Sequence, residues 1–282
     1  MGLLVPNERV SAKYLYYFFR SDAYQEFLAS LSAGANINNL RFSDLGKLLV
    51  PVPNEVDQKR IVAILDQAFA ALDRARAYAE ANLTDAAGLF GSLLSEAFGS
   101  HRDWPGRFLP DISENLDRQR VPITKKDRKP GSVPYYGASG VVDHVAGHIF
   151  DEDLLLVSED GANLLARTYP IAFSISGKSW VNNHAHVLRF ADPVTQEYVR
   201  LYLNSISLAP YVSGMAQPKL NQKSLNSIPI PFPDPATRAD IVTKASSARE
   251  HCDELADNYE SQIADIATLR QSLLQQAFTG AL

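Results

Sequence analysis

Cysteine is almost absent from this chain, since Cys252 is the only one among 282 residues. A single cysteine excludes an internal disulfide framework and is typical of proteins kept in a reducing compartment. No apolar run approaches the roughly 18 residues needed to cross a bilayer. The first ten residues, MGLLVPNERV, lack the basic and then apolar pattern of a signal peptide. We therefore expect a cytoplasmic protein with no membrane partner.

The motifs of common enzymes are missing too. The sequence contains no G-x-x-x-x-G-K-[ST] phosphate loop, no G-x-S-x-G nucleophile turn and no H-E-x-x-H zinc motif. Nothing in it resembles a methyltransferase cofactor loop or the carboxylate set of a nuclease. The sequence therefore predicts a protein that is not an enzyme and needs no cofactor. Its net charge of −5 counts mildly against a freestanding nucleic-acid binder, which is usually basic.

One segment is present twice. Residues 61–99 and 241–280 match at a constant offset of 180 positions, so that Ile61 falls on Ile241 and Phe98 on Phe278. The segments before them share leucine and proline positions. Leucines at 40 and 45 and prolines at 51 and 53 recur at 220, 225, 231 and 233. The pattern indicates a duplicated unit in which each copy ends in a long helix.

Each copy has the spacing of a coiled-coil helix. Steps of three and four hold one predominantly apolar face over about five heptads. Because such a face needs a partner, we predict that the two helices pair antiparallel within the chain, with Asn82 and Gln262 as buried polar residues that fix the register. Two helices packed separately on globular domains are the alternative. The predicted helix-pairing residues are Ile61, Leu65, Leu72, Asn82, Leu93, Ile241, Cys252, Leu255, Tyr259, Gln262, Ile266 and Leu273.

The rest of the chain alternates short apolar runs with turn signals. Residues 154–157, 171–175 and 184–190 have the composition of strands, and residues 193–205 that of a helix. Residues 10–31 also predict a helix, followed by a polar loop at 32–40. The predicted fold class is α+β. Its expected parts are the last part of a globular domain at 1–54, a long helix at 55–99, a complete domain at 100–235 and a second long helix at 236–282.

The order of these features resembles a specificity subunit of a type I restriction–modification system. The resemblance rests on the Leu220-x4-Leu225-x2-Ile228-Pro-Ile-Pro-x-Pro233 block, its first copy at 40–53, and the helix endings SLLSEAFG and SLLQQAFTGAL. It also rests on PYYGASG at 134–140, VNNHAHVL at 181–188 and WPGRFLPDISE at 104–114. This family has two target recognition domains, each followed by a long helix. Against that pattern, the N-terminal part of the first domain is expected to be missing.

The resemblance implies a non-catalytic subunit that recognises double-stranded DNA. It would dock methyltransferase subunits, and through them restriction subunits, along the helix pair. A helix of about 40 residues would span about 60 Å, a useful separation between two DNA half-sites. Two chains could associate to restore two recognition domains.

Four groups of residues are candidates for DNA contact. Basic side chains supply phosphate charge, glycines allow close backbone approach, and asparagine suits the major-groove edge of adenine. The predicted residues are Arg118, Arg120, Lys125, Lys126, Arg128, Lys129, Tyr136, Ser139, Lys178, Trp180, Asn182, Asn183, Gln217, Lys219 and Asn221. The same groups also fit a solvated loop, core aromatics, a polar turn and a helix cap.

Two other functions stay open at this point. The first is a truncated coiled-coil scaffold or regulator that binds methyltransferase subunits without recognising DNA. The second is a metal-dependent enzyme. His184 and His186 would point to the same side of a strand, with His144, His148 and Asp151 nearby in sequence.

Overall fold

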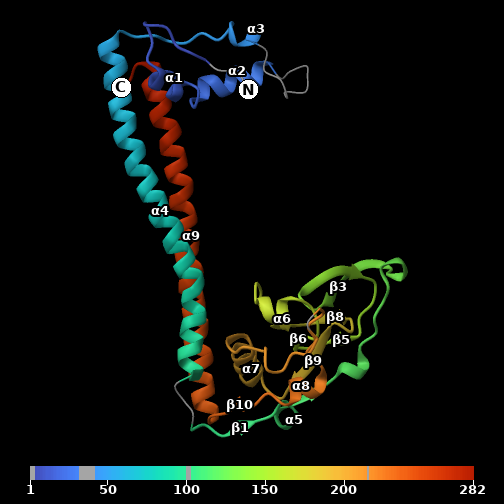
Figure 1. The fold of residues 1–282 in the computed structure, drawn as a ribbon. Coiled ribbons are helices and arrows are strands. Elements are labelled where there is room, and N and C mark those ends of the chain that lie inside the picture. The colour runs from blue at the N-terminus through green and yellow to red at the C-terminus, as the bar shows by residue number, and fades with distance from the viewer. Residues whose placement is uncertain (1–3, 32–41, 100–102, 215) are drawn as a thin grey trace. The chain divides into compact units, whose positions relative to one another are not determined.

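The computed structural model describes residues 4–31, 42–99, 103–214 and 216–282 (Figure 1). The polar loop predicted at 32–40, including Leu40, lies outside these ranges. The chain divides into two compact units, one formed by residues 1–87 with 253–282 and the other by residues 88–252. None of the helices within the described ranges is both long and apolar enough to span a membrane.

Both units contain part of the two long helices, α4 (Glu55–Gly99) and α9 (Pro235–Thr279). In the first unit the beginning of α4 packs on the end of α9, where Ile61, Leu65, Leu274 and Ala277 are buried together. In the second unit the end of α4 packs on the beginning of α9, where Leu94, Phe98 and Ala245 are buried with Ile241 against them. The predicted antiparallel pairing is therefore present.

The predicted polar contact between the helices is wrong, because Asn82 and Gln262 are both exposed. Around residue 82 the buried face of α4 is carried by Ala79 and Ala86, whose side chains are too short to cover a polar neighbour. A straight helix has 3.6 residues per turn, so its contact face drifts relative to a heptad pattern.

Five more of the predicted pairing positions are buried or half-buried, and two are not. Leu255 is exposed, and Leu93 is 38 % exposed. At the end of α4 the buried side chains are Leu94 and Phe98, because the helix packs there on the globular part of the second unit. The positions that stay at least partly buried outside the pairs already described are Leu72, Cys252, Tyr259, Ile266 and Leu273.

The N-terminal segment of the first unit contains α1 (Ala12–Phe18), α2 (Asp22–Leu31) and α3 (Phe42–Leu45). The single helix predicted for 10–31 is thus two helices. The chain turns between them, and the buried hydroxyl of Ser21 donates to the carbonyl of Phe18 (2.7 Å). Tyr14 and Tyr17 of α1 are buried against α4 and α9.

The second unit contains two four-stranded sheets. One has the order β2-β9-β6-β7 and is antiparallel throughout. The other has the order β4-β3-β8-β5, in which β3 and β8 are parallel. The strands are β2 (Ser113–Asn115), β3 (Pro130–Gly137), β4 (Gly140–Val145), β5 (Phe150–Asp151), β6 (Leu154–Ser158), β7 (Ala172–Ile175), β8 (Lys178–Val181) and β9 (Ala185–Phe190). A short pair, β1 (Gly106–Arg107) with β10 (Ile230–Pro231), joins the two ends of this domain.

Helices complete the second unit. The helix predicted at 193–205 is α7 (Pro193–Ser205), which Asp192 caps through the backbone nitrogen of Thr195. The shorter elements are α5 (Leu109–Ile112), α6 (Asn163–Ala166), α8 (Gln222–Asn226) and the 3-10 turns η1 (Asp117–Gln119) and η2 (Lys125–Asp127).

Strand β6 lies at the centre of the domain and is buried on both faces. Leu155 and Val157 pack in one apolar cluster with α7, whereas Leu154 and Leu156 pack in a second cluster with Phe150 of the other sheet. Side chains alternate between the two faces of a strand, so a strand covered on both sides is a continuous apolar run. The predicted α+β class is therefore confirmed, and the sheet that contains β6 is the middle layer of the domain.

Candidate nucleic-acid interface

Three of the loops predicted to contact DNA come together at one end of β6. The buried hydroxyl of Ser158 donates to the carbonyl of Ala138 in the β3–β4 turn. The backbone nitrogen of Asn182 donates to the carbonyl of Tyr136 (3.0 Å), and that of Gly161 donates to the carbonyl of Pro218 (3.0 Å). The turn at 138–140, the turn at 182–184 and the segment at 216–221 therefore surround the end of this strand.

The side chains of these loops have different roles. Ser139, Asn183 and Gln217 are exposed. Asn182 is only 6 % exposed, and its amide oxygen accepts the backbone N–H of His184 (2.8 Å), so it shapes the turn. Asn221 is exposed, but its amide oxygen caps α8 by accepting the N–H of Ser224 (2.9 Å).

Some side chains of the basic stretch are exposed, and others are already paired within the domain. Its exposed members are Arg118, Lys125, Lys126 and Lys129. Arg128 pairs with Asp143 at 2.9 Å and lies over the ring of Tyr135, 4.3 Å from its centroid. Because this guanidinium is already paired and stacked, it fixes the stretch against β3 and β4.

Arg120, which the sequence predicts to contact phosphate, has internal partners in the structure. Its side chain is 13 % exposed and pairs with Glu159 at 2.7 Å. The same nitrogen donates to the carbonyl of Ala185 (2.7 Å), and Nε donates to the carbonyl of Asp117 (3.0 Å). With its donors directed at internal acceptors, Arg120 anchors the beginning of the basic stretch.

The remaining predicted residues lie on the sheet that contains β3 and β8. Trp180 donates its indole N–H to the carbonyl of Val121 (2.7 Å) and so holds the basic stretch over this sheet. Tyr136 packs beside Phe173, and burial raises the pKa of its hydroxyl. Lys178 is exposed at the start of β8.

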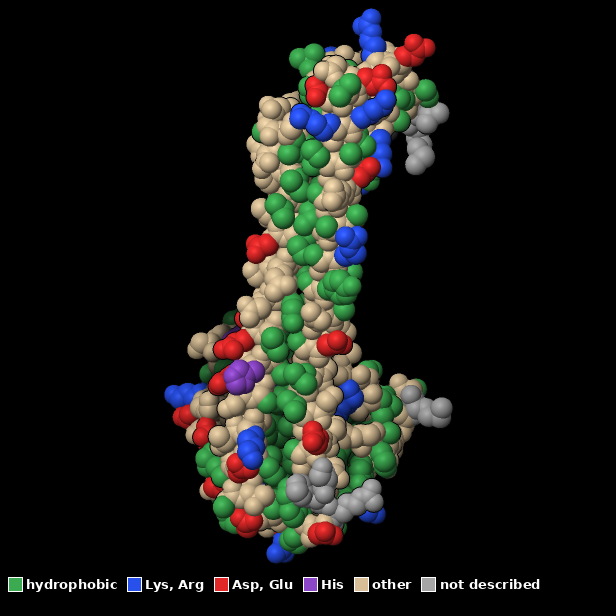
Figure 2. Space-filling view, turned by 90° about the vertical axis from the view of Figure 1, so that its left-hand side faces the viewer, with side chains coloured by type: hydrophobic (Ala, Val, Ile, Leu, Met, Phe, Trp, Pro, Cys, Tyr) green, Lys and Arg blue, Asp and Glu red, His purple; other side chains and the backbone are tan. Residues whose placement is uncertain are grey.

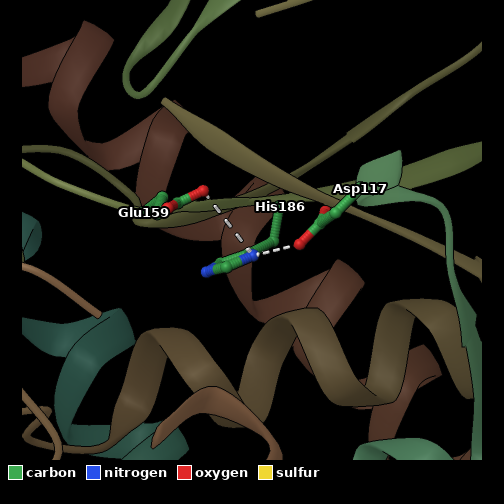
Figure 3. Close-up of side chains that lie close together, drawn as sticks. All are labelled: Asp117, Glu159 and His186. Carbon is green, nitrogen blue, oxygen red and sulfur yellow. Dashed lines mark hydrogen bonds and ion pairs between the residues drawn. The ribbon is translucent and has the colours of Figure 1, made fainter. Parts of the chain in front are cut away.

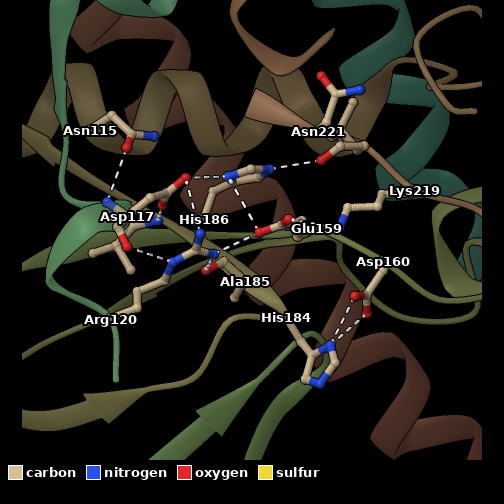
Figure 4. Close-up of polar contacts among 12 residues, drawn as sticks. Asn115, Asp117, Arg120, Glu159, Asp160, His184, Ala185, His186, Lys219 and Asn221 are labelled. Atoms are coloured by element: carbon tan, nitrogen blue, oxygen red, sulfur yellow. Dashed lines mark hydrogen bonds and ion pairs between the residues drawn. The ribbon is translucent and has the colours of Figure 1, made fainter. Parts of the chain in front are cut away.

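A buried ionic cluster contacts the segment at 216–221 through Leu220 and Lys219 (Figures 3 and 4). His186 of β9 is 1 % exposed, with Nδ1 2.6 Å from Asp117 Oδ2 and Nε2 2.8 Å from the carbonyl oxygen of Leu220. Glu159, just after β6, places Oε2 3.9 Å from Nδ1. Sequence reasoning missed Asp117 and Glu159, because no spacing links three segments so far apart in the chain.

Both buried carboxylates are held ionised. Burial by itself would raise the pKa of Asp117, but the hydrogen bond and charge of His186, the N–H of Val187 and the charge of Arg120 together lower it. For Glu159 burial again opposes ionisation, while Arg120, His186 and Lys219 lower the pKa below its usual range. The cluster is therefore a network of paired charges.

The same three residues are also the candidate metal ligands of this domain. One ligand atom from each of Asp117, Glu159 and His186 lies within 4.8 Å of the others. Each of these groups already has partners, however, since Glu159 also pairs with Lys219 at 3.2 Å. Arg120 and Lys219 already contact the Glu159 carboxylate oxygens that a metal ion would need. His184 does not join the group, because its Nδ1 contacts Asp160 at 2.8 Å.

Comparison with known proteins identifies the family to which this sequence is similar. A sequence profile described as the type I restriction modification DNA specificity domain matches residues 1–80 and 101–258. The StySPI specificity subunit of Salmonella potsdam, a type I restriction enzyme subunit, is 23% identical over 100% of this chain and 68% of its own length. The Haemophilus influenzae protein S.HindORF215P, named as a type I specificity subunit, is 31% identical over 51% of this chain and 36% of that protein.

The fold also has a counterpart among solved structures. A chain from a structural study of complex assembly in the type I R-M system superimposes with a TM-score of 0.79. It is 18% identical, and the match covers 98% of this chain and 73% of that one. At this identity the likeness concerns the fold alone. Since the family profile covers most of the sequence, this chain belongs to the family of type I restriction–modification specificity subunits.

Proposed function

We propose that this chain is a non-catalytic subunit that recognises one DNA half-site for a type I restriction–modification complex. The observation that carries the proposal is the convergence of three exposed polar loops at one end of β6. Recognition of duplex DNA needs phosphate contacts for affinity and base-edge contacts for sequence. The loops and the basic stretch beside them offer both kinds of side chain.

Residues are assigned to these two roles by exposure. Arg118, Lys125, Lys126 and Lys129 are exposed cations that suit the phosphate backbone, and Lys178 adds to them. Ser139, Asn183 and Gln217 are exposed donors and acceptors that suit base edges. Lys219 is half exposed and extends from the same loops, although Glu159 neutralises part of its charge.

In this proposal each part of the chain has its own role. Residues 100–235 form the recognition domain, and residues 1–54 correspond to the last part of another. Residues 55–99 and 236–282 provide the helix pair to which methyltransferase subunits bind, with restriction subunits attached through them. Figure 2 shows hydrophobic side chains gathered along the two long helices. In the second unit an apolar hollow of about 340 Å³ between α4 and α9 is lined in part by Phe90, Leu93 and Ile241.

A salt-dependent DNA-binding titration tests the proposal. The chain, alone and with the methyltransferase subunits of its host, would be titrated against labelled duplexes of random sequence at several salt concentrations. We expect sequence-dependent binding whose affinity falls as salt rises, because bound phosphates release counterions. Binding to methyltransferase subunits without any DNA preference in either condition would contradict DNA recognition and would favour the scaffold alternative.

A further inference from the structure

His186 faces two groups that can only accept hydrogen bonds. A backbone carbonyl has no proton to give, and the carboxylate of Asp117 has none when ionised. Nδ1 lies 2.6 Å from Asp117 Oδ2, and Nε2 lies 2.8 Å from the carbonyl oxygen of Leu220. A neutral imidazole carries one N–H and can satisfy one of these acceptors, whereas the imidazolium carries two.

We infer that His186 is a buried imidazolium at neutral pH, and that it acts as a positioning residue which fastens the segment 216–221 to the core of the recognition domain. Its effect on DNA binding rests on the proposed function, whereas its protonation and its hold on this segment do not.

The charges around the ring support a buried cation. Asp117 faces it from η1, and Glu159 faces it from the turn after β6. Arg120 pairs with both carboxylates, and Lys219 pairs with Glu159 (Figure 4). A buried charge is tolerated only where it is paired and hydrogen-bonded, and both ring nitrogens of His186 face hydrogen-bond acceptors.

A neutral alternative would move the proton from the ring to Asp117. A protonated Asp117 could donate to Nδ1 while Nε2–H donated to Leu220. The other carboxyl oxygen of Asp117, however, accepts the N–H of Val187 at 2.8 Å, and Arg120 lies 3.6 Å from the carboxyl group. Both neighbours favour an ionised carboxylate, so the proton belongs on the ring.

The hydrogen bond to Leu220 connects this charge to the candidate interface. The backbone nitrogen of Leu220 donates to the carbonyl of Glu159 (2.7 Å), while its own carbonyl accepts from His186. One residue earlier, Lys219 exchanges two backbone hydrogen bonds with Ser213 (2.8 and 2.9 Å). Gln217 and Lys219 extend from this segment. Among the described residues, the hydrogen bond from His186 is the only side-chain bond between the segment and β9.

Nuclear magnetic resonance of protein labelled with 15N-histidine tests the protonation directly. At pH 7.5 we expect both ring nitrogens of His186 to show the chemical shifts of protonated nitrogen. In Asp117→Asn the new amide could donate to Nδ1, so only Nε2 should remain protonated. A wild-type spectrum with one unprotonated His186 nitrogen would overturn the inference. His148→Gln, at an exposed histidine, serves as the control for assignment.

Hydrogen exchange tests the positioning role. In His186→Gln we expect the amide of Leu220 to exchange at least about ten-fold faster, because a buried charged hydrogen bond is lost. The same amide should be unaffected in His148→Gln. Unchanged exchange in His186→Gln would overturn the positioning role. If that variant does not fold, the wild-type spectrum and Asp117→Asn still decide the protonation.

DNA binding forms a separate arm of the experiment. We expect His186→Gln to weaken sequence-specific binding more than non-specific binding, since the displaced loop carries base-edge candidates. If the wild-type protein shows no sequence-specific binding, the proposed function fails while the spectrum and the exchange rates still decide the imidazolium and its hold on Leu220. Loss of the Leu220 bond with unchanged specificity would remove residues 216–221 from the interface.

Discussion

The ring of Tyr14 packs edge-on against Phe278 with centroids 5.2 Å apart, although the two residues lie near opposite ends of the chain. Tyr198 makes the same contact with Phe98 at 5.4 Å. The hydroxyl of Tyr14 donates to the carbonyl of Pro51 (2.9 Å), and that of Tyr198 donates to the carbonyl of Pro231 (2.6 Å). Each globular segment therefore packs on the end of the long helix that belongs to the other copy.

Truncating these phenylalanines should destabilise the unit that contains each one. Removal of a buried aromatic ring typically costs about 3–5 kcal/mol. We expect Phe98→Ala to destabilise the second unit by about 3 kcal/mol and Phe278→Ala to destabilise the first unit by a similar or slightly smaller amount. Denaturant unfolding of each variant measures the effect. Phe42→Ala, at a side chain 77% exposed, is the matched control, and equal stabilities for all three would refute the packing described above.

Arg120 should matter for stability and little for phosphate contact. Arg120→Gln would remove one of the cations that pair with Glu159 and Asp117, and breaking a buried ion pair typically costs about 3–5 kcal/mol. We expect a loss near the lower figure in chemical unfolding, with the salt dependence of DNA binding unchanged. A stable variant with a reduced salt slope would show instead that Arg120 contacts phosphate.

Lys125 and Lys126 should show the opposite behaviour. Because both are exposed on η2, replacing them with glutamine should leave stability nearly unchanged and weaken binding to all duplexes alike. Each lost phosphate contact should reduce the slope of log K against log salt by about 0.9. Lys244→Gln, an exposed lysine on α9 that pairs with Asp240, is the control. Weaker binding to one sequence only would contradict the phosphate role.

Acid should destabilise the second unit through its buried carboxylates. The folded pKa values of Asp117 and Glu159 are lowered, so the stability they contribute is complete above their unfolded values of about 3.9 and 4.3. That contribution is lost as the pH falls from there through the lower folded values. We expect unfolding free energy to fall below about pH 4. Glu159→Gln should be less stable at pH 7 and should show a shallower fall, and a variant with the wild-type pH profile would contradict this.

The sequence predicted the long helices well because their signal is local and repeated. Both α4 and α9 match the expected ranges closely, and their antiparallel pairing followed from matched apolar faces. The pattern could not locate the shift in contact face that leaves Asn82 exposed and buries Leu94 in place of Leu93. At Leu94 the shift depends on the globular domain against which the helix end packs.

A cation–π contact between α4 and α9 occurs in both units, although the two copies of the repeat do not match in sequence at these positions. Arg270 lies over the ring of Phe69 at 4.6 Å, and Arg249 lies over the ring of Phe90 at 4.3 Å. Position 249 is 69 plus 180, and position 90 is 270 minus 180. The cation–π contact is thus present in both units with its two partners exchanged, and an alignment of the copies would score each position as a mismatch.

The candidate site was predictable only as separate segments. Basic, aromatic and amide residues were recognisable in four stretches, but their arrangement depends on the fold. The structure commits Arg120, Asn182 and Asn221 to internal hydrogen bonds. It also brings Asp117, Glu159 and His186 together from three distant segments, a contact that no local periodicity could reveal.

Selection from a randomised duplex library tests whether this chain recognises one DNA sequence. The chain would be mixed with its methyltransferase subunits, bound DNA would be recovered and sequenced, and the procedure would be repeated with Asn183→Ala and Gln217→Ala. We expect wild-type protein to enrich one defined sequence and the variants to relax the preference at particular positions within it. A stable complex that recovers DNA without enriching any sequence would contradict sequence recognition by this chain.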